Sequence, residues 1–166
     1  MSLVLDAVNF AILAHGAQVR KYNGEPYVTH LIAVAKTVSN VSDDPMLVAA
    51  AILHDVLEDT RVTEKQLREK FPERVVNLVV EVTDVSKPHD GNRRIRKAMD
   101  RDHLAKASPC AQTIKYADIL DNTSNILQND PKFAELYIQE KRELLRVMTK
   151  GDVVLRDKAI KQIGGI

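Results

Sequence analysis

The chain has few of the features that mark secreted, membrane or nucleic-acid-coating proteins. One cysteine in 166 residues excludes an intramolecular disulfide and favours a reducing, cytoplasmic compartment. No apolar run reaches the ~18–20 residues of a membrane span. A secretory signal would require a basic residue near the N-terminus, but none precedes Arg20. Lys and Arg total 24 against 23 Asp and Glu, so no excess of positive charge is available for DNA or an anionic membrane. We expect a cytoplasmic globular protein with neither nucleic-acid nor membrane partner.

Apolar sequence with a helical period is abundant instead. Hydrophobic residues make up 45% of the chain, and the length suits one compact domain that needs no disulfide or structural metal. Apolar residues at three- and four-residue steps, with caps and breaks, predict helices, and the Asn-Gly and Glu-Pro pairs in 21–27 predict a turn. The predicted helices begin near the N-terminus and then cover 28–40, 46–58, a short stretch from 63, 72–85, 93–106, 109–128, 131–150 and a last stretch from 152. We predict an all-α fold: a single domain over 1–166, built as a bundle of about eight or nine helices.

The strongest candidate site lies at the end of the most apolar predicted helix. Residues 46–53 are apolar on every face, which predicts a central buried helix. His54, Asp55, Glu58 and Asp59 follow directly, and buried ionisable groups need a partner or a metal. On a continuous helix they would form two adjacent i, i+4 stripes, one able to bind a metal and one able to reach a nearby water. The alternative is an ordinary polar helix terminus, which is disfavoured because carboxylates oppose the helix dipole there.

Two more residues are candidate ligands, although each has an ordinary structural interpretation. Asp118 lies in an apolar helical stretch and could be a buried hydrogen-bond hub. His30 follows the turn segment and could be a core histidine, as we expect for His15. Together with His54 and Asp55, these residues make a mixed nitrogen and oxygen set that suits Mn²⁺, Fe²⁺ or Zn²⁺. Spacing alone does not establish that set.

Four segments together resemble the hydrolase domain of the RelA/SpoT enzymes, which belong to the HD-domain metal phosphohydrolases. They are residues 14–21, 24–30, 50–60 and 115–122, and their order and spacing also match the family. The resemblance covers about residues 5–150. Since the chain ends at Ile166, no synthetase domain is expected to follow. The sequence therefore resembles a stand-alone small alarmone hydrolase of the metazoan SpoT-homologue kind.

The resemblance implies a role for each matching residue. The implied metal ligands, usually for Mn²⁺, are His30, His54, Asp55 and Asp118. Glu58 and Asp59 match the catalytic acidic pair that acts on the attacking water. The implied substrate-binding residues are Arg20 and Lys21 near the nucleotide, Arg93, Arg96 and Lys97 on a basic helix facing the phosphates, Asn122 at the nucleoside, and Tyr137 and Lys141 lining the site.

The reaction that the resemblance implies is removal of pyrophosphate from the 3′ position of guanosine tetra- or pentaphosphate. A divalent ion would activate water, a carboxylate base would add ~10²–10⁴ in rate, and Lys and Arg would spread the phosphoryl charge. The partner would be a small nucleotide polyphosphate; the oligomeric state is left open. Residues 119–125 contain no cation, whereas relatives carry an Arg-containing stretch there. An adenosine alarmone, the 2′-phosphate of NADPH or a nucleoside monophosphate therefore remains an alternative substrate. A non-catalytic nucleotide sensor is the alternative class, and the intact acidic pair counts against it.

Overall fold

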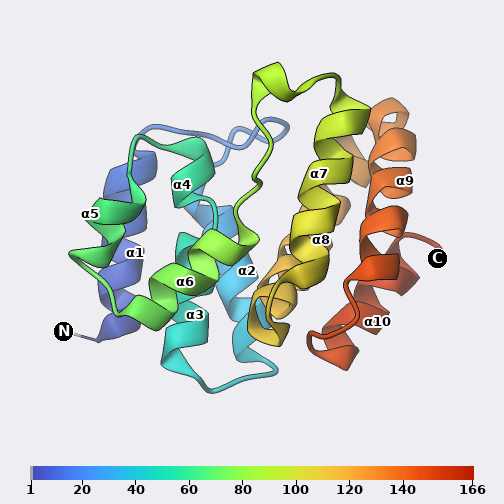
Figure 1. The fold of residues 1–166 in the computed structure, drawn as a ribbon. Helices are drawn as coiled ribbons and strands as arrows, with labels where there is room; N and C mark the ends of the chain where they lie inside the picture. Colours follow the sequence, from blue (N-terminus) through green and yellow to red (C-terminus); the bar gives the residue numbers. More distant parts are fainter. Residues whose placement is uncertain (1) are drawn as a thin grey trace. The chain divides into compact units, whose positions relative to one another are not determined.

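The structure is a computed structural model that describes residues 2–166 (Figure 1). Over those residues the chain forms ten α-helices and one short 3-10 helix, and its β-structure is a single bridge between Val19 and Pro26. The predicted all-α fold is confirmed. Among the described helices, none combines the length and the apolar character needed to cross a membrane. The chain divides into two compact units, one ending at Thr83 and one beginning at Asp84, and each is described by itself.

The N-terminal unit is built around the predicted central helix. Its helices are α1 (Leu3–His15), α2 (Val28–Ser39), α3 (Pro45–Leu53), α4 (Val56–Asp59), α5 (Glu64–Arg68) and α6 (Glu73–Val82). Asp44 caps α3 by accepting from the Met46 amide, and Pro45 occupies the first turn. From Ala49 to Leu53 every side chain of α3 is buried, because α1, α2 and α6 all pack against it (Figure 1). The predicted buried helix is therefore confirmed.

The predicted helix over 46–58 is wrong in one respect, because it is broken at His54–Asp55. Asp55 lies at φ −97° and ψ −2°, and the separate one-turn helix α4 follows it. The His54 imidazole Nδ1 lies 2.7 Å from the carbonyl oxygen of Ala51, which the amide of residue 55 would use in a continued helix. The two i, i+4 stripes expected on a continuous helix therefore do not form, and the extra break raises the number of α-helices within residues 2–166 to ten.

The C-terminal unit contains η1 (Pro88–Asp90), α7 (Arg93–Lys106), α8 (Pro109–Asn129), α9 (Pro131–Val147) and α10 (Val153–Gln162). Side chains cap three of these helices, since Ser108, Asp130 and Asp152 each accept a backbone N–H in the first turn of α8, α9 and α10. α8 packs against α9 and α10, and α7 packs against α9 (Figure 1). Every residue of α8 from Ala111 to Ile119 is buried, so the polar side chains in that stretch must find partners inside the unit.

Candidate metal centre and active site

Three of the four predicted metal ligands converge in the N-terminal unit. His30 comes from the first turn of α2, while His54 and Asp55 occupy the break after α3. The Asp55 Oδ2 atom lies 3.1 Å from His54 Nε2 and 3.5 Å from His30 Nε2. One ligand atom from each residue lies within 4.8 Å of the other two. Both imidazoles are 1% exposed and Asp55 is 9% exposed, so the cluster is shielded from bulk water.

The hydrogen bond of His54 determines which ring nitrogen faces the cluster. The Ala51 carbonyl can only accept, so Nδ1 of His54 donates to it over 2.7 Å. In the neutral ring this leaves the lone pair of Nε2 directed at Asp55. A nitrogen lone pair and a carboxylate oxygen at that separation favour a shared cation between them. Two imidazoles and one carboxylate fit a transition-metal ion such as Mn²⁺, Fe²⁺ or Zn²⁺ better than Ca²⁺ or Mg²⁺.

The two predicted catalytic carboxylates lie one turn beyond this cluster. Glu58 and Asp59 are exposed members of α4, and their amides donate to the Asp55 carbonyl over 3.1 and 2.9 Å. The one-turn helix therefore starts at a candidate ligand and ends at the acidic pair. Both carboxylates therefore follow a candidate ligand within one turn of the chain, and both are accessible to solvent.

Two residues in this unit contact the site although sequence reasoning gave them no role. The hydroxyl of Tyr27 donates to Asp55 Oδ2 over 2.6 Å. The side-chain nitrogen Nε2 of Gln18 donates to Asp59 Oδ2 over 3.0 Å. Both lie inside the segments 14–21 and 24–30 that carry the family resemblance. Only their place in those segments could have pointed to Gln18 and Tyr27. No pattern of neighbouring residues predicts either contact.

The predicted basic pair lies in the same loop between α1 and α2. Arg20 donates its amide to the Glu25 carbonyl over 2.8 Å, next to the bridge between Val19 and Pro26. Lys21 is exposed at the tip, with its Nζ 5.0 Å from the ring centroid of Tyr22. The structure therefore places these cations in the unit that contains the three converged ligands.

The fourth predicted ligand, Asp118, is a buried residue of α8 in the C-terminal unit. Lys115 Nζ lies 3.1 Å from Asp118 Oδ2, and Asn122 Nδ2 donates to Asp118 Oδ1 over 2.5 Å. Asn122 thus lies on the same helix face as Asp118, and its contact with the nucleoside stays a prediction. Lys115 is buried as well, and sequence reasoning had not selected it. Its ammonium balances a carboxylate that would otherwise be costly to bury.

Tyr137 and Lys141 lie one turn apart on α9 of the same unit. Tyr137 is buried, and burial raises the pKa of its hydroxyl. Lys141 Nζ lies 4.9 Å from the Tyr137 ring centroid. Burial, followed by the charge of Lys115, lowers the pKa of Lys141 to about 8. A lysine of this kind changes its charge close to neutral pH.

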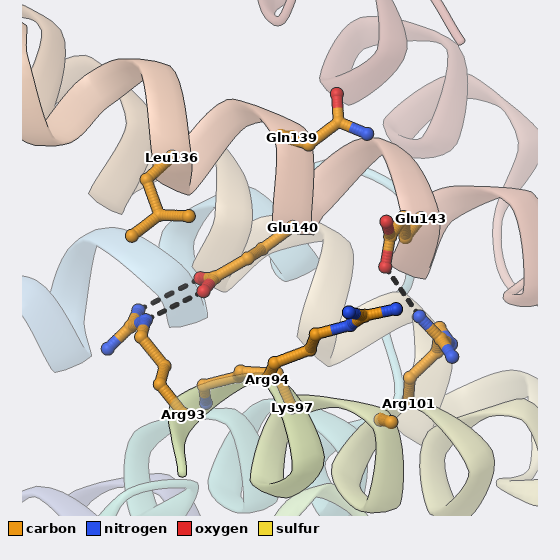
Figure 2. Close-up of a pocket in the computed structure, with 9 residues that line it drawn as sticks. Arg93, Arg94, Lys97, Arg101, Leu136, Gln139, Glu140 and Glu143 are labelled. Atoms are coloured by element: carbon orange, nitrogen blue, oxygen red, sulfur yellow. Dashed lines mark hydrogen bonds and ion pairs between the residues drawn. The ribbon is translucent and has the colours of Figure 1, made fainter.

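The basic helix α7 forms one wall of a cavity of about 640 Å³, and α9 forms the other wall (Figure 2). Of the three predicted phosphate-facing residues, Arg93 and Lys97 line it, but Arg96 is not among its lining residues. Arg94 and Arg101 also line it, and sequence reasoning had not selected them. The Arg93 guanidinium binds Glu140 through two hydrogen bonds of 2.6 and 2.9 Å. Any anion entering here would compete with a carboxylate already in place.

Comparison with known proteins identifies the family. A model of the HD domain matches residues 7–133. The chain is 32% identical over 154 residues to the guanosine-3′,5′-bis(diphosphate) 3′-pyrophosphohydrolase MESH1 of Xenopus tropicalis, which covers 90% of this chain and 84% of that protein. It is 35% identical over 150 residues to the protein of the same name from Drosophila melanogaster, and this match covers 88% of this chain and 80% of that protein.

A solved structure described as a metazoan orthologue of SpoT that hydrolyses ppGpp and plays a role in starvation responses has the same fold. Its TM-score is 0.86 at 28% identity, and the match covers 100% of this chain and 98% of that one. The chain therefore belongs to the HD-domain family and, within it, to the RelA/SpoT-type phosphohydrolases of the metazoan SpoT-homologue kind.

Proposed function

We propose that this enzyme removes the 3′-pyrophosphate from guanosine tetra- or pentaphosphate, giving GDP or GTP and pyrophosphate. The buried His30–His54–Asp55 cluster is the observation that carries the proposal. It lies in a chain that is 32% identical, over most of its length, to an enzyme named for this reaction. Arg20 and Lys21, which lie in the same unit as the cluster, suit a substrate that bears several phosphates.

The metal that we propose is Mn²⁺, with Fe²⁺ or Zn²⁺ as alternatives that suit the same donors. His30, His54 and Asp55 would hold it, and the family resemblance adds Asp118. A bound divalent ion activates water and neutralises phosphoryl oxygens. Glu58 or Asp59 would take the proton of the attacking water, because both are exposed carboxylates on the one-turn helix that follows Asp55.

The substrate contacts that we propose come from the residues implied by the resemblance. Arg20 and Lys21 would bind phosphates from the loop of the N-terminal unit. In the C-terminal unit the proposed contacts are Arg93, Arg96, Lys97, Asn122, Tyr137 and Lys141. Several lysine and arginine donors would distribute the negative charge that develops during phosphoryl chemistry.

Purified protein supplied with Mn²⁺ is expected to release pyrophosphate from ppGpp, and EDTA is expected to stop the reaction until Mn²⁺ is restored. Product identification over a panel of ppGpp, pppGpp, an adenosine alarmone, NADPH and a nucleoside monophosphate checks this. Preferred release of phosphate from NADPH or a monophosphate would assign a different substrate to the same site. Tight ppGpp binding without turnover in Mn²⁺, Fe²⁺ or Zn²⁺ would identify a sensor instead.

The substrate affinity is expected to weaken above pH 8 because Lys141 loses its charge there. The charged groups that act on this ammonium are Lys115 and Asp118 of α8, Lys97 of α7, and Asp84. With a pKa of about 8, Lys141 is mostly protonated at pH 7 and mostly neutral at pH 9. KM for ppGpp should therefore rise, by up to roughly tenfold, between these values.

The matched variant for this prediction is Lys141→Arg, because a guanidinium stays charged throughout this range. Its KM should change much less between pH 7 and pH 9. A wild-type KM that stays constant over the range, or a Lys141→Met variant with the wild-type KM, would remove Lys141 from the substrate contacts.

A further inference from the structure

The loop between α1 and α2 is hydrogen-bonded to a candidate metal ligand and to a candidate catalytic carboxylate. We infer that His15, Gln18 and Tyr27 form one positioning network that orients Asp55 for metal binding and Asp59 for proton transfer. The inference rests on the proposed function and adds three residues to it. The network lies wholly in the N-terminal unit.

The first branch runs through Tyr27. Its hydroxyl donates to Asp55 Oδ2 over 2.6 Å, and this is the oxygen nearest to both candidate histidine ligands. A hydrogen bond from outside the ligand set fixes the carboxylate in the rotamer that faces the imidazoles. Such outer contacts typically change metal affinity or activity by about 10–100-fold when removed.

The second branch runs through Gln18, and its donors and acceptors can be assigned. The Asp59 carboxylate only accepts, so the Gln18 side-chain nitrogen faces it, 3.0 Å from Oδ2. The amide oxygen of Gln18 then faces His15 Nδ1 at 2.8 Å. That oxygen also only accepts, so Nδ1 of His15 carries the proton. The chain of donors runs from His15 through Gln18 to Asp59.

His15 joins the two branches. Its ring stacks on Tyr27, with 5.0 Å between centroids and 23° between planes, and it is only 7% exposed. Backbone hydrogen bonds link the same three residues. The backbone amide of Tyr27 donates to the Gln18 carbonyl over 2.9 Å, and the backbone amide of Gln18 donates to the His15 carbonyl over 3.0 Å. His15, which we expected to be structural, therefore contacts both Gln18 and Tyr27, the residues that bond to Asp59 and Asp55.

The network predicts two separable defects. Tyr27→Phe retains the aromatic ring and removes only the hydroxyl, so the affinity for Mn²⁺ should fall about tenfold. Saturating Mn²⁺ should then restore most of kcat. His15→Phe retains an aromatic ring for the stack and removes the Nδ1 donor, and Gln18→Leu removes the link itself. Both should lower kcat about tenfold while KM and the affinity for Mn²⁺ stay near the wild-type values.

The matched controls are Tyr22→Phe in the same loop and Gln128→Leu on the exposed side of α8, and both should behave as wild type. Thermal melts establish that each variant is folded. Titration with MnCl₂ by calorimetry and steady-state kinetics measure the two defects. In addition, ¹⁵N NMR of the substrate-free protein should show His15 protonated at Nδ1, with that hydrogen bond absent from Gln18→Leu.

An unchanged Mn²⁺ affinity in Tyr27→Phe would overturn the first branch. An unchanged kcat in a folded His15→Phe, or a His15 proton on Nε2, would overturn the second. If the wild-type protein hydrolyses none of the nucleotides tested, the proposed function fails. The Mn²⁺ titration and the NMR measurement would still decide whether the network exists.

Discussion

Asp55→Asn is expected to abolish tight metal binding and to lower kcat/KM by at least roughly 10³-fold. The carboxylate Oδ2 of Asp55 is the atom closest to Nε2 of both His30 and His54. Replacing the carboxylate by an amide of equal size removes the only negative charge from the three converged ligands. Metal activation of a phosphoryl reaction contributes several kcal/mol, and each 1.36 kcal/mol corresponds to a factor of ten.

Mn²⁺ titration by calorimetry and ppGpp turnover measure this loss. Asp102→Asn is the matched control, because the Asp102 side chain is 75% exposed on α7 and should leave both quantities unchanged. Retained turnover in a folded Asp55→Asn protein would show that the His30–His54–Asp55 cluster is not the metal centre.

Glu58→Gln and Asp59→Asn are expected to separate catalysis from metal binding. Loss of the true proton acceptor should lower kcat by ~10²–10⁴. The affinity for Mn²⁺ should remain close to wild type, because both side chains are exposed on α4 and lie outside the converged ligand set. Rates measured at saturating Mn²⁺ and saturating ppGpp report kcat directly.

Comparison of the two variants identifies the base. The residue with the larger loss in kcat is the proton acceptor, and the other assists it. Glu69→Gln replaces an exposed carboxylate elsewhere in the same unit and should retain full activity. If both Glu58→Gln and Asp59→Asn turn over at the wild-type rate, the acidic pair has no part in the chemistry.

Much of the secondary structure could be predicted from short-range signals. Asp44 with Pro45, Ser108 with Pro109, and Asp130 with Pro131 mark helix starts, because a capping side chain and a proline act on neighbouring backbone groups. The apolar run before His54 likewise predicted a buried helix, and the structure confirms it. The combination of His54 and Asp55 with the other three segments was sufficient to predict the family.

The break at His54–Asp55 was not predictable from periodicity. A continuous helix satisfies the same spacing, whereas in the structure the His54 ring bonds to the Ala51 carbonyl, which the amide of residue 55 would use in a continued helix. This competition depends on the side-chain rotamer in a buried environment. The break lies within the candidate site, since His54 Nε2 is 3.1 Å from Asp55 Oδ2 and the helix that begins after Asp55 carries Glu58 and Asp59.

The sequence by itself determined most of the helices, several of their caps, the buried central helix and the family. Only the tertiary structure decided which residues meet. Packing of α2 against α3 brings His30 beside a residue 25 positions later. The loop between α1 and α2 brings Tyr27 to Asp55, 28 positions away, and Gln18 to Asp59, 41 positions away. Periodicity and capping act over a few residues, whereas these contacts depend on how whole helices pack.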